Sequence, residues 1–255
     1  MGLYAVTGAA SGIGAAIVER LRRDGHEVIT VDLRNADLKV DLATADGRQQ
    51  AIEAIAERAA ATPLAGLVPC AGVGPHTSPR GLIARINYFG SIALLEGLRP
   101  QLEQARGSVV LISSNSAPME EYDRSYTDAL LAGDEETAAG LADSLPGQTC
   151  YGGSKYALAV WMRRNNADWA RAGIRMNAVA PGYTETALVE ATRDDPEYAQ
   201  VMREFVASIP VGRPGRPEDQ ADAVAFLLGE QASFISGSVL FIDGGHDAMF
   251  RPDRF

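Results

Sequence analysis

The stretch Thr7-Gly8-Ala9-Ala10-Ser11-Gly12-Ile13-Gly14 decides the fold of this 255-residue chain. It follows a short apolar run at residues 3–6 and opens an amphipathic run at residues 15–23, and the next apolar run, 28–31, closes on Asp32. A strand, a glycine turn, a helix and a second strand in this order predict one βαβ unit with a right-handed crossover. Glycines in this context, with an acidic residue ending the second strand, are typical of a dinucleotide-binding turn. A glycine turn with a purely structural role is the alternative.

Strand-like and helix-like runs alternate along the rest of the chain. After a brief third strand, we expect helices at 44–60, 79–104, 150–172 and 217–228, and strands at 66–70, 108–112, 174–179 and 239–242. This alternation is typical of an α/β fold in which helices cover both faces of a parallel sheet. We therefore predict a single Rossmann-fold domain over residues 1–255, with a doubly wound parallel sheet of about seven strands.

Two long segments interrupt this alternation. The insert at 115–149 predicts a helical hairpin, because Gly133 followed by Asp134 is typical of a helix end and a new helix start. Four leucines at helical spacing would supply the apolar surface that this hairpin buries: Leu130, Leu131, Leu141 and Leu145. We interpret the acids at 134–136 as a solvated face. The second segment, 184–208, is expected to form one or two helices over the site as a substrate lid.

Composition favours a globular protein of the cytoplasm. Hydrophobic residues make up 46% of the chain and charged residues 22%, and the formal net charge is −10. This charge, without any block of Lys or Arg, argues against nucleic acid or an anionic membrane as a partner. Two cysteines and three scattered histidines predict neither a disulfide framework nor a metal site. We expect no signal peptide and no membrane helix.

The glycine turn predicts a pyrophosphate site. Gly8 permits the tight turn, Gly12 lets the backbone approach the phosphates, and Gly14 allows close packing of the helix. The N-terminus of that helix then faces the phosphates. Ser11 and Ile13 lie between these glycines and are candidate cofactor contacts.

Asp32 favours NAD over NADP. A carboxylate at this position hydrogen-bonds the ribose hydroxyls of adenosine and repels a 2′-phosphate. Ser11 is neutral where a base would help to hold that phosphate, although Arg34 lies two residues beyond Asp32. NADP, and Asp32 as an ordinary loop acid, remain alternatives.

Tyr151-Gly152-Gly153-Ser154-Lys155 is the candidate catalytic stretch. A tyrosine and a lysine four residues apart on a helix lie one above the other on one face. A phenol titrates near pH 10, and a nearby ammonium favours the phenolate and lowers its pKa. The phenol would then suit general acid–base chemistry. A buried ring beside a snorkelling amine is the alternative.

Five motifs together resemble the short-chain dehydrogenase/reductase family. They are Thr7-Gly-x-x-x-Gly-Ile-Gly14, Asn87-x-x-Gly90, Ser114, Tyr151-x-x-x-Lys155 and Pro181-Gly182. The resemblance extends from the first strand to Asp243-Gly244-Gly245. Within the family the chain is most similar to the bacterial 3α-hydroxysteroid dehydrogenase/carbonyl reductase group. That similarity lies in Asn87-Tyr88-Phe89-Gly90, the insert before Tyr151, and the tail from Asp247 to Pro252.

The resemblance implies four catalytic roles. Tyr151 exchanges a proton with the substrate oxygen, and Lys155 lowers the Tyr151 pKa and holds the nicotinamide ribose. Ser114 hydrogen-bonds the reacting oxygen; its neighbour Ser113 points to the opposite face of the strand by alternation. Asn87 positions a water that links Lys155 to solvent. The alternative is that Asn87 is only a residue at a helix kink.

The resemblance also implies further cofactor contacts. Asp41 and Leu42 match the adenine-contacting pair, although Asp41 as a helix cap is an alternative. Leu33 is a further candidate cofactor contact. Similar sequences carry Asn-Ala-Gly where this chain has Cys70-Ala71-Gly72. We expect Cys70 to pack beside the cofactor rather than to react, and Cys150 to be a packing residue. The nicotinamide side is expected to involve Pro181, Gly182, Tyr183, and Thr184 or Thr186.

The function implied is NAD-dependent interconversion of a secondary alcohol and a ketone, on a hydroxysteroid or a similar apolar alicyclic substrate. An aromatic alcohol of the coniferyl type, a general carbonyl reductase and a non-catalytic dinucleotide sensor are alternatives. The candidate substrate contacts are Ser114, Pro118, Met119, Tyr151 and Tyr183.

We also expect a homo-oligomer, a homodimer rather than a homotetramer. The insert would obstruct pairing through the helices at 79–104 and 150–172. The helix at 217–228 and the last strand would then remain for self-association.

Overall fold

The computed structural model describes residues 1–119, 122–186 and 199–254. The middle of the expected lid, 187–198, lies outside the described residues. Beyond it, helix α9 (Ala199–Ala207) agrees with the expected helical content of that region.

A parallel sheet of seven strands forms the centre of the described structure and confirms the predicted fold class. The strands are β1 (Leu3–Thr7), β2 (Glu27–Asp32), β3 (Leu38–Lys39), β4 (Leu64–Val68), β5 (Ser108–Ile112), β6 (Arg175–Pro181) and β7 (Val239–Ile242). Their order in the sheet is β3-β2-β1-β4-β5-β6-β7. The order reverses at β1 and β4, and a doubly wound sheet binds ligands beyond the strand ends at such a switch point.

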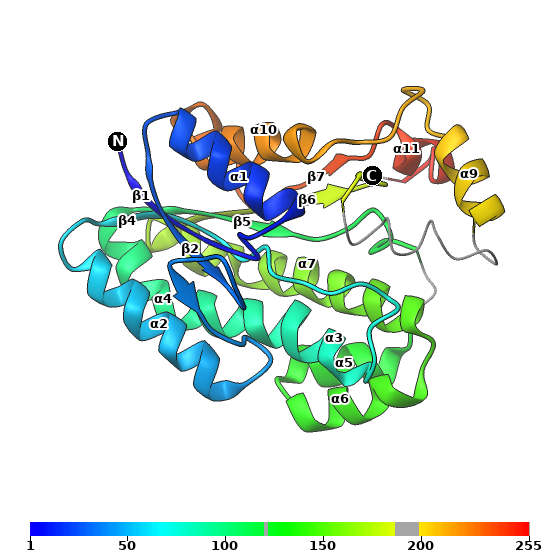
Figure 1. Cartoon of the computed structure of the whole chain (residues 1–255), viewed down its shortest axis with the longest axis horizontal. Coiled ribbons are helices and arrows are strands. Elements are labelled where there is room, and N and C mark those ends of the chain that lie inside the picture. Colours follow the sequence, from blue (N-terminus) through cyan, green and yellow to red (C-terminus); the bar gives the residue numbers. More distant parts are fainter. Residues whose placement is uncertain (120–121, 187–198, 255) are drawn as a thin grey trace.

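Helices cover both faces of this sheet (Figure 1). One face carries α1 (Gly12–Arg23) and α10 (Pro217–Leu228), which pack side by side. The other carries α2 (Ala45–Ala59), α4 (Ser91–Ala105) and α7 (Gly147–Arg171). Each face has its own apolar core. All five residues of β5 are buried, as expected for a central parallel strand, which has no solvated face.

The region 79–104 differs from the single helical region that its sequence predicts. It contains α3 (Gly81–Ile83), a π-helix (Ala84–Gly90) and then α4. A π turn widens the helix locally and is frequent at functional sites. Asn87 lies in this turn and is fully buried, where its side chain bonds the backbone of Val73. Local periodicity could not show this turn, because it accompanies a contact to another segment.

The insert forms the predicted helical hairpin. Helix α5 (Arg124–Ala132) ends at Gly133, which has φ +77°, and α6 (Glu135–Ser144) begins after Asp134, whose carboxylate accepts from the Thr137 amide. Helix α5 packs on α7, and α6 packs on α3 and the π-helix. Leu130 and Tyr126 of α5 are fully buried. The hairpin therefore belongs to the core on the α7 face.

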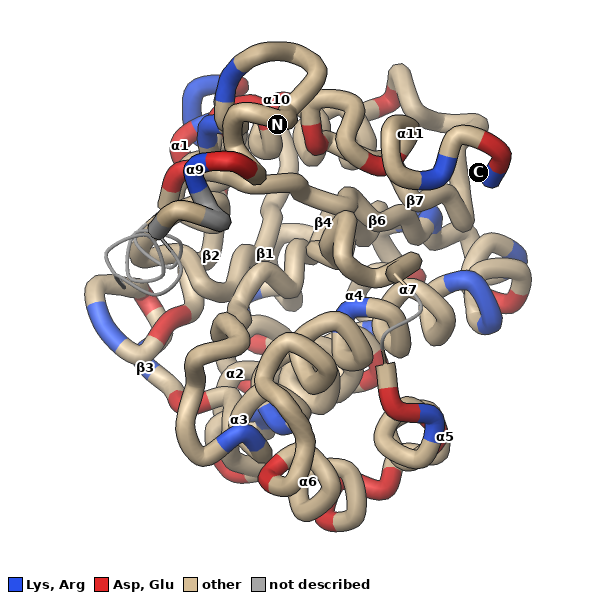
Figure 2. The backbone as a smooth tube through the Cα atoms, turned by 90° about the vertical axis from the view of Figure 1, so that its right-hand side faces the viewer, with Lys and Arg blue, Asp and Glu red and all other residues tan. Residues whose placement is uncertain are grey.

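The acids of this hairpin correct one expectation. Figure 2 shows blue and red segments adjoining where α2, α3 and α6 meet. There Glu135, with a side chain only 24% exposed, forms ion pairs with Arg48 and Arg85. The interpretation of the acids at 134–136 as a solvated face is therefore wrong for Glu135, because partners distant in sequence surround it.

Two further short elements lie among the described residues, a 3-10 helix (Glu230–Ala232) and α11 (His246–Phe250). Across residues 1–119, 122–186 and 199–254, no helix is long and apolar enough to cross a membrane. In those same ranges no group of three or more His, Cys, Asp or Glu side chains is placed to hold a metal.

Candidate active site

Tyr151 and Lys155 lie one turn apart near the start of α7. The Lys155 side chain is buried, and its Nζ donates a hydrogen bond to the Ile112 carbonyl at 2.9 Å, at the end of β5. Its Nζ also lies 5.8 Å from the centre of the Tyr151 ring. Burial lowers the pKa of Lys155 to about 8, against a smaller opposing effect of Cys70.

The pKa of Tyr151 moves in the direction opposite to the sequence-based expectation. Burial of the phenol raises its pKa, and a hydrogen bond with Ser114 only partly offsets this. The expected net lowering of the Tyr151 pKa is therefore wrong, because Lys155 does not bring it below its ordinary value. The physical reason is that desolvation of the phenolate outweighs every attractive interaction that it makes.

Ser113 and Ser114 follow β5 and bond different residues of α7. Ser113 Oγ donates to the carbonyl of Lys155 at 3.0 Å and so supports α7. Ser114 Oγ lies beside the Tyr151 hydroxyl and accepts from the amide and the hydroxyl of Ser116, at 3.2 Å and 2.9 Å. The Ser114 hydroxyl proton is thereby left to donate toward Tyr151 or a substrate oxygen.

Asn87 braces the loop that follows β4. Its Oδ1 accepts from the Val73 amide at 2.8 Å, and its Nδ2 donates to the Val73 carbonyl at 3.1 Å. A Cβ at Gly72 would lie 3.2 Å from Asn87 Oδ1 and 3.6 Å from Lys155 Nζ. Gly72 therefore leaves open a small space that both polar groups border.

The glycine turn has the close contacts expected of a pyrophosphate cradle. Gly8 has φ +64°, and a Cβ there would lie 2.8 Å from Ala71 Cα. A Cβ on Gly14 would lie 2.1 Å from the Gly8 carbonyl oxygen, so only glycine lets α1 start this close to β1. Gly12 also has a positive φ, +54°, and opens α1 toward solvent beside Thr186. Ser11 and Ile13 flank Gly12 at the first turn of α1.

The acidic residue at the end of β2 is tied to the glycine turn. Asp32 Oδ2 accepts from the Ala10 amide at 3.0 Å, and Oδ1 accepts from the Leu33 amide at 2.7 Å. The Leu33 side chain is 66% exposed. Asp41 follows β3 and is exposed, and Leu42 is buried next to it. The structure thus brings these four predicted cofactor contacts to one end of the sheet.

Cys70, Ala71 and Gly72 follow β4. The Ala71 amide donates to Thr7 Oγ1 at 2.9 Å, which joins this loop to the end of β1. Burial raises the pKa of the Cys70 thiol to about 12, despite the opposing charge of Lys155. Cys70 therefore remains a thiol at neutral pH, which fits a packing residue.

The two threonines of the segment after β6, Thr184 and Thr186, have different surroundings. Thr184 is buried, and its hydroxyl donates to the Gly182 carbonyl at 3.0 Å and accepts from Gln220 at 3.3 Å. Tyr183 is half-buried, and its carbonyl accepts from the Gly215 amide. Thr186 is the threonine of this pair that borders the glycine turn. Pro181 ends β6 beside Gly182.

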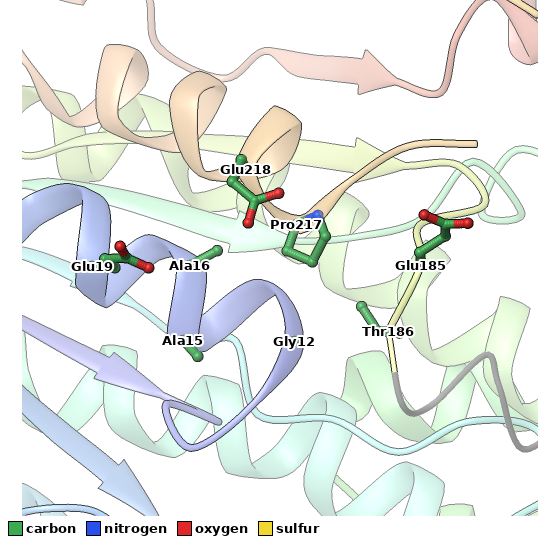
Figure 3. A pocket seen from close by; sticks show the side chains of 8 residues that line it. All are labelled: Gly12, Ala15, Ala16, Glu19, Glu185, Thr186, Pro217 and Glu218. Atoms are coloured by element: carbon green, nitrogen blue, oxygen red, sulfur yellow. The ribbon is translucent and has the colours of Figure 1, made fainter. Parts of the chain in front are cut away.

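A cavity of about 360 Å³ lies at the N-terminus of α1 (Figure 3). Three segments line it: the first turns of α1, the start of α10, and the segment that follows β6. The lining residues are Gly12, Ala15, Ala16, Glu19, Glu185, Thr186, Pro217 and Glu218. Of the glycine turn it touches only Gly12, its lining includes three carboxylates, and it does not extend to Tyr151.

A second, small cleft begins at Asn115, the residue after Ser114. It is lined by Asn115, Met119, Asp247, Phe250 and Arg251, so the start of the insert meets helix α11 there. The Met119 side chain is 37% exposed, and the neighbouring Pro118 is half-buried. Of the two candidate substrate contacts of the insert, Met119 lines this cleft and Pro118 does not.

Sequence reasoning missed several residues of these two sites. Glu185, Pro217 and Glu218 border the larger cavity, and Asn115 and Phe250 border the smaller one. The start of α10 carried a usable signal, because Pro217 is at a predicted helix start and helix starts face the ligand edge of such a fold. The contact between residues 119 and 250 had no local signal.

Comparison with known proteins agrees with this geometry. Residues 3–126 match the short chain dehydrogenase family model, and residues 136–247 match the model described as enoyl-(acyl carrier protein) reductase. The chain is 38% identical, over the whole of both chains, to 3-alpha-hydroxysteroid dehydrogenase/carbonyl reductase of Comamonas testosteroni. It is 29% identical to coniferyl-alcohol dehydrogenase of a Pseudomonas species, with 94% of each chain covered.

A solved structure is also very similar over the full length. The crystal structure of 3-alpha-hydroxysteroid dehydrogenase from Pseudomonas sp. B-0831, complexed with NADH, superposes with a TM-score of 0.95. The two sequences are 46% identical, and all of each chain is covered. The chain therefore belongs to the short-chain dehydrogenase/reductase family, oxidoreductases that act on CH–OH groups with an NAD(P) cofactor.

Proposed function

We propose that this enzyme interconverts a secondary alcohol and a ketone with NAD, and that its substrate is a 3α-hydroxysteroid or a similar apolar alicyclic alcohol. The observation that carries the reaction is the placement of Ser114, Tyr151 and Lys155 at the ends of β5 and α7. The substrate class is supported by the two relatives named for 3-alpha-hydroxysteroids, which match the chain along its whole length.

The residues around the glycine turn fit an NAD molecule. A Cβ on Gly8 would clash with Ala71 and one on Gly14 with the Gly8 carbonyl, so glycine brings the N-terminus of α1, which favours phosphate, up to the end of β1. NAD would supply the hydride acceptor and donor. Asp32, at the end of β2, would accept hydrogen bonds from the adenosine ribose, with Leu33 beside it and Asp41 and Leu42 on the adenine side.

On the nicotinamide side, Cys70, Ala71 and Gly72 would pack against the bound cofactor. Thr186 would contact the pyrophosphate or the carboxamide, because Thr184 is already bonded to Gln220 and Gly182. Pro181, Gly182 and Tyr183 would border the nicotinamide.

Three side chains would hold and move the proton. In ketone reduction, Tyr151 donates its phenolic proton to the carbonyl oxygen while Ser114 hydrogen-bonds the same atom, where negative charge develops. In alcohol oxidation the phenolate takes the proton. Lys155 holds its ammonium against the Ile112 carbonyl and near the Tyr151 ring, where it would bond the nicotinamide ribose and favour the phenolate. Asn87 would hold a water beside Lys155, next to Gly72.

On the substrate side, Met119, Pro118 and Tyr183 would contact the apolar body of the alcohol. Met119 and Phe250 line the same small cleft, which begins at Asn115, so an apolar ring system could lie between the insert and α11.

A panel of secondary alcohols tests this function. With NAD⁺, read at the NADH absorbance, a 3α-hydroxysteroid should give a higher kcat/KM than coniferyl alcohol or a small aliphatic alcohol. If coniferyl alcohol is the better substrate, the alternative represented by the aromatic-alcohol relative holds instead. If the protein binds NADH but turns over none of these alcohols, the proposed enzymatic function is wrong and the alternative of a dinucleotide sensor holds.

We also propose that the enzyme is a cytoplasmic homodimer. Cys70 and Cys150 are free thiols, as in a reducing compartment. Three apolar side chains are exposed on neighbouring elements: Phe226 of α10 at 44%, Leu240 of β7 at 40%, and Phe234 between them at 103%. Strand β7 is at one edge of the sheet, and apolar groups at an exposed edge are typical of an association surface.

A further inference from the structure

Arg48, near the start of α2, is buried with a side chain only 7% exposed, and five hydrogen bonds surround its guanidinium. Its Nε donates to the Leu42 carbonyl at 2.8 Å, and Nη2 donates to the carbonyls of Ala43 and Arg85, each at 3.1 Å. Nη1 and Nη2 also donate to the two carboxylate oxygens of Glu135, at 2.6 Å and 2.8 Å. This two-point geometry fixes the plane of the guanidinium as well as its position.

The two carbonyls nearest to α2 belong to the turn that follows β3. The Val40 amide donates to the Asp32 carbonyl at 3.0 Å, so this turn starts beside the end of β2. Within it, the Ala43 amide donates to Asp41 Oδ1 at 2.9 Å, and Thr44 then caps α2. Arg48 therefore donates hydrogen bonds to two backbone carbonyls of this turn, those of Leu42 and Ala43.

The partner that orients Arg48 comes from the insert. Glu135 is in the first turn of α6, 87 residues away from Arg48 in sequence. Burial alone would raise the pKa of Glu135, but the hydrogen bonds and charges of Arg48 and Arg85 hold it below its ordinary value. Glu135 is therefore ionised at neutral pH. Its neighbour Glu136 also bonds Arg85, but its side chain is 83% exposed.

We propose that Arg48 and Glu135 are positioning residues for the cofactor, through which the insert sets the affinity for the adenosine end of NAD. The inference rests on the proposed function, in which Asp41 and Leu42 contact the adenine. Without Glu135, the guanidinium would be an unpaired charge in a buried place and would turn toward water. The carbonyls of residues 42 and 43 would then lose their donors, and the turn would no longer hold one conformation.

Two substitutions and a matched control test this inference. Glu135→Gln removes the charge that orients Arg48, and Arg48→Lys keeps a cation for Glu135 but lacks the fork that reaches both carbonyls. Glu136→Gln removes an adjacent acid of the same helix turn that does not touch Arg48. Thermal unfolding of each variant shows whether it is folded. If Glu135→Gln fails to fold, Arg48→Lys decides the outcome.

The measurements separate positioning from general damage. The Kd values for NADH and for ADP-ribose should rise about tenfold in Glu135→Gln and Arg48→Lys. The kcat at saturating NAD⁺ should stay within about twofold of the parent, since neither residue touches the reacting atoms. Without cofactor, amide hydrogen exchange at residues 41–44 should be faster than in the parent. Glu136→Gln should match the parent in all three measurements.

Several results would overturn the inference. Parental Kd and exchange in both variants would do so, as would a loss of kcat as large as the loss of affinity. Tenfold weaker binding in Glu136→Gln would show that any loss of charge on α6 has this effect. A parent enzyme that binds no NADH would instead overturn the proposed function, and this inference with it.

Discussion

At the scale of single residues, the Tyr151 hydroxyl is the group that turnover requires. Tyr151→Phe should keep the fold and NAD binding and lose turnover by about 10²-fold or more, because the variant has no proton to exchange. Steady-state kinetics and a binding titration with NADH measure the two effects.

Tyr126→Phe is the matched control. It removes a phenol from the neighbouring α5, where the hydroxyl is buried without a partner among the described residues. Its turnover should equal that of the parent. Near-parental kcat in Tyr151→Phe would contradict the proton-transfer role.

The raised pKa of Tyr151 predicts opposite pH dependences for the two directions of the reaction. A raised pKa keeps the phenol protonated at neutral pH, which supports ketone reduction. Alcohol oxidation needs the phenolate, so its kcat/KM should increase as pH rises from about 6 to about 10. Because the pKa of Lys155 is about 8, the loss of its charge above that pH should make this increase less steep. Oxidation that slows steadily over the same range would refute this assignment.

Asp32 should determine the choice of cofactor. We expect a higher kcat/KM with NAD⁺ than with NADP⁺, because the carboxylate repels a 2′-phosphate. Asp32→Ala should narrow this difference, mainly through a better KM for NADP⁺. A parent enzyme that prefers NADP⁺ would show that Arg34, and not Asp32, controls the site.

Residues with a local pattern were predictable, and residues held by distant partners were not. Gly8, Gly12 and Gly14 were predictable because backbone geometry requires glycine in that order after a strand. Arg48 resembled any polar residue of an amphipathic helix, since its partner Glu135 lies in another segment. The pKa of Tyr151 was predicted in the wrong direction, because sequence spacing shows the neighbouring cation but not the burial of the phenol.

At the scale of elements, the alternation of strands and helices predicted the sheet and most helices within a few residues. Thr44 was the start of a predicted helix and is the N-cap of α2, with Oγ1 accepting from the Gly47 amide. The π turn at 84–90 was missed because local periodicity does not show the contact between Asn87 and Val73 that accompanies it.

The hairpin of α5 and α6 should behave as part of the core. Leu130→Ala should lower the free energy of unfolding by about 2–5 kcal/mol, because Leu130 is fully buried. Its neighbour Leu131 is only half-buried, so Leu131→Ala should cost clearly less. Urea unfolding compares the two variants. Equal, small losses would show that the hairpin is not integrated into the core.

At the scale of the whole molecule, the exposed apolar side chains of α10 and β7 make assembly testable. Leu240→Lys places a charge among them and should lower the mass measured by light scattering toward that of a single chain. Glu103→Lys, on the exposed surface of α4, is the control and should leave the mass unchanged. If Glu103→Lys alone dissociates the assembly, pairing occurs through α4 and α7 despite the insert.

The packing of α1 against α10 also has a consequence for how the chain folds. Arg20 of α1 bonds Asp222 of α10, although 202 residues separate them in sequence. Contacts between such distant segments form late, since a long loop must close before they are gained. The cavity at the start of α1 has α10 as one of its walls. During refolding from denaturant, secondary structure should therefore return before the ability to bind NADH, and the delay between the two would time the docking of α10.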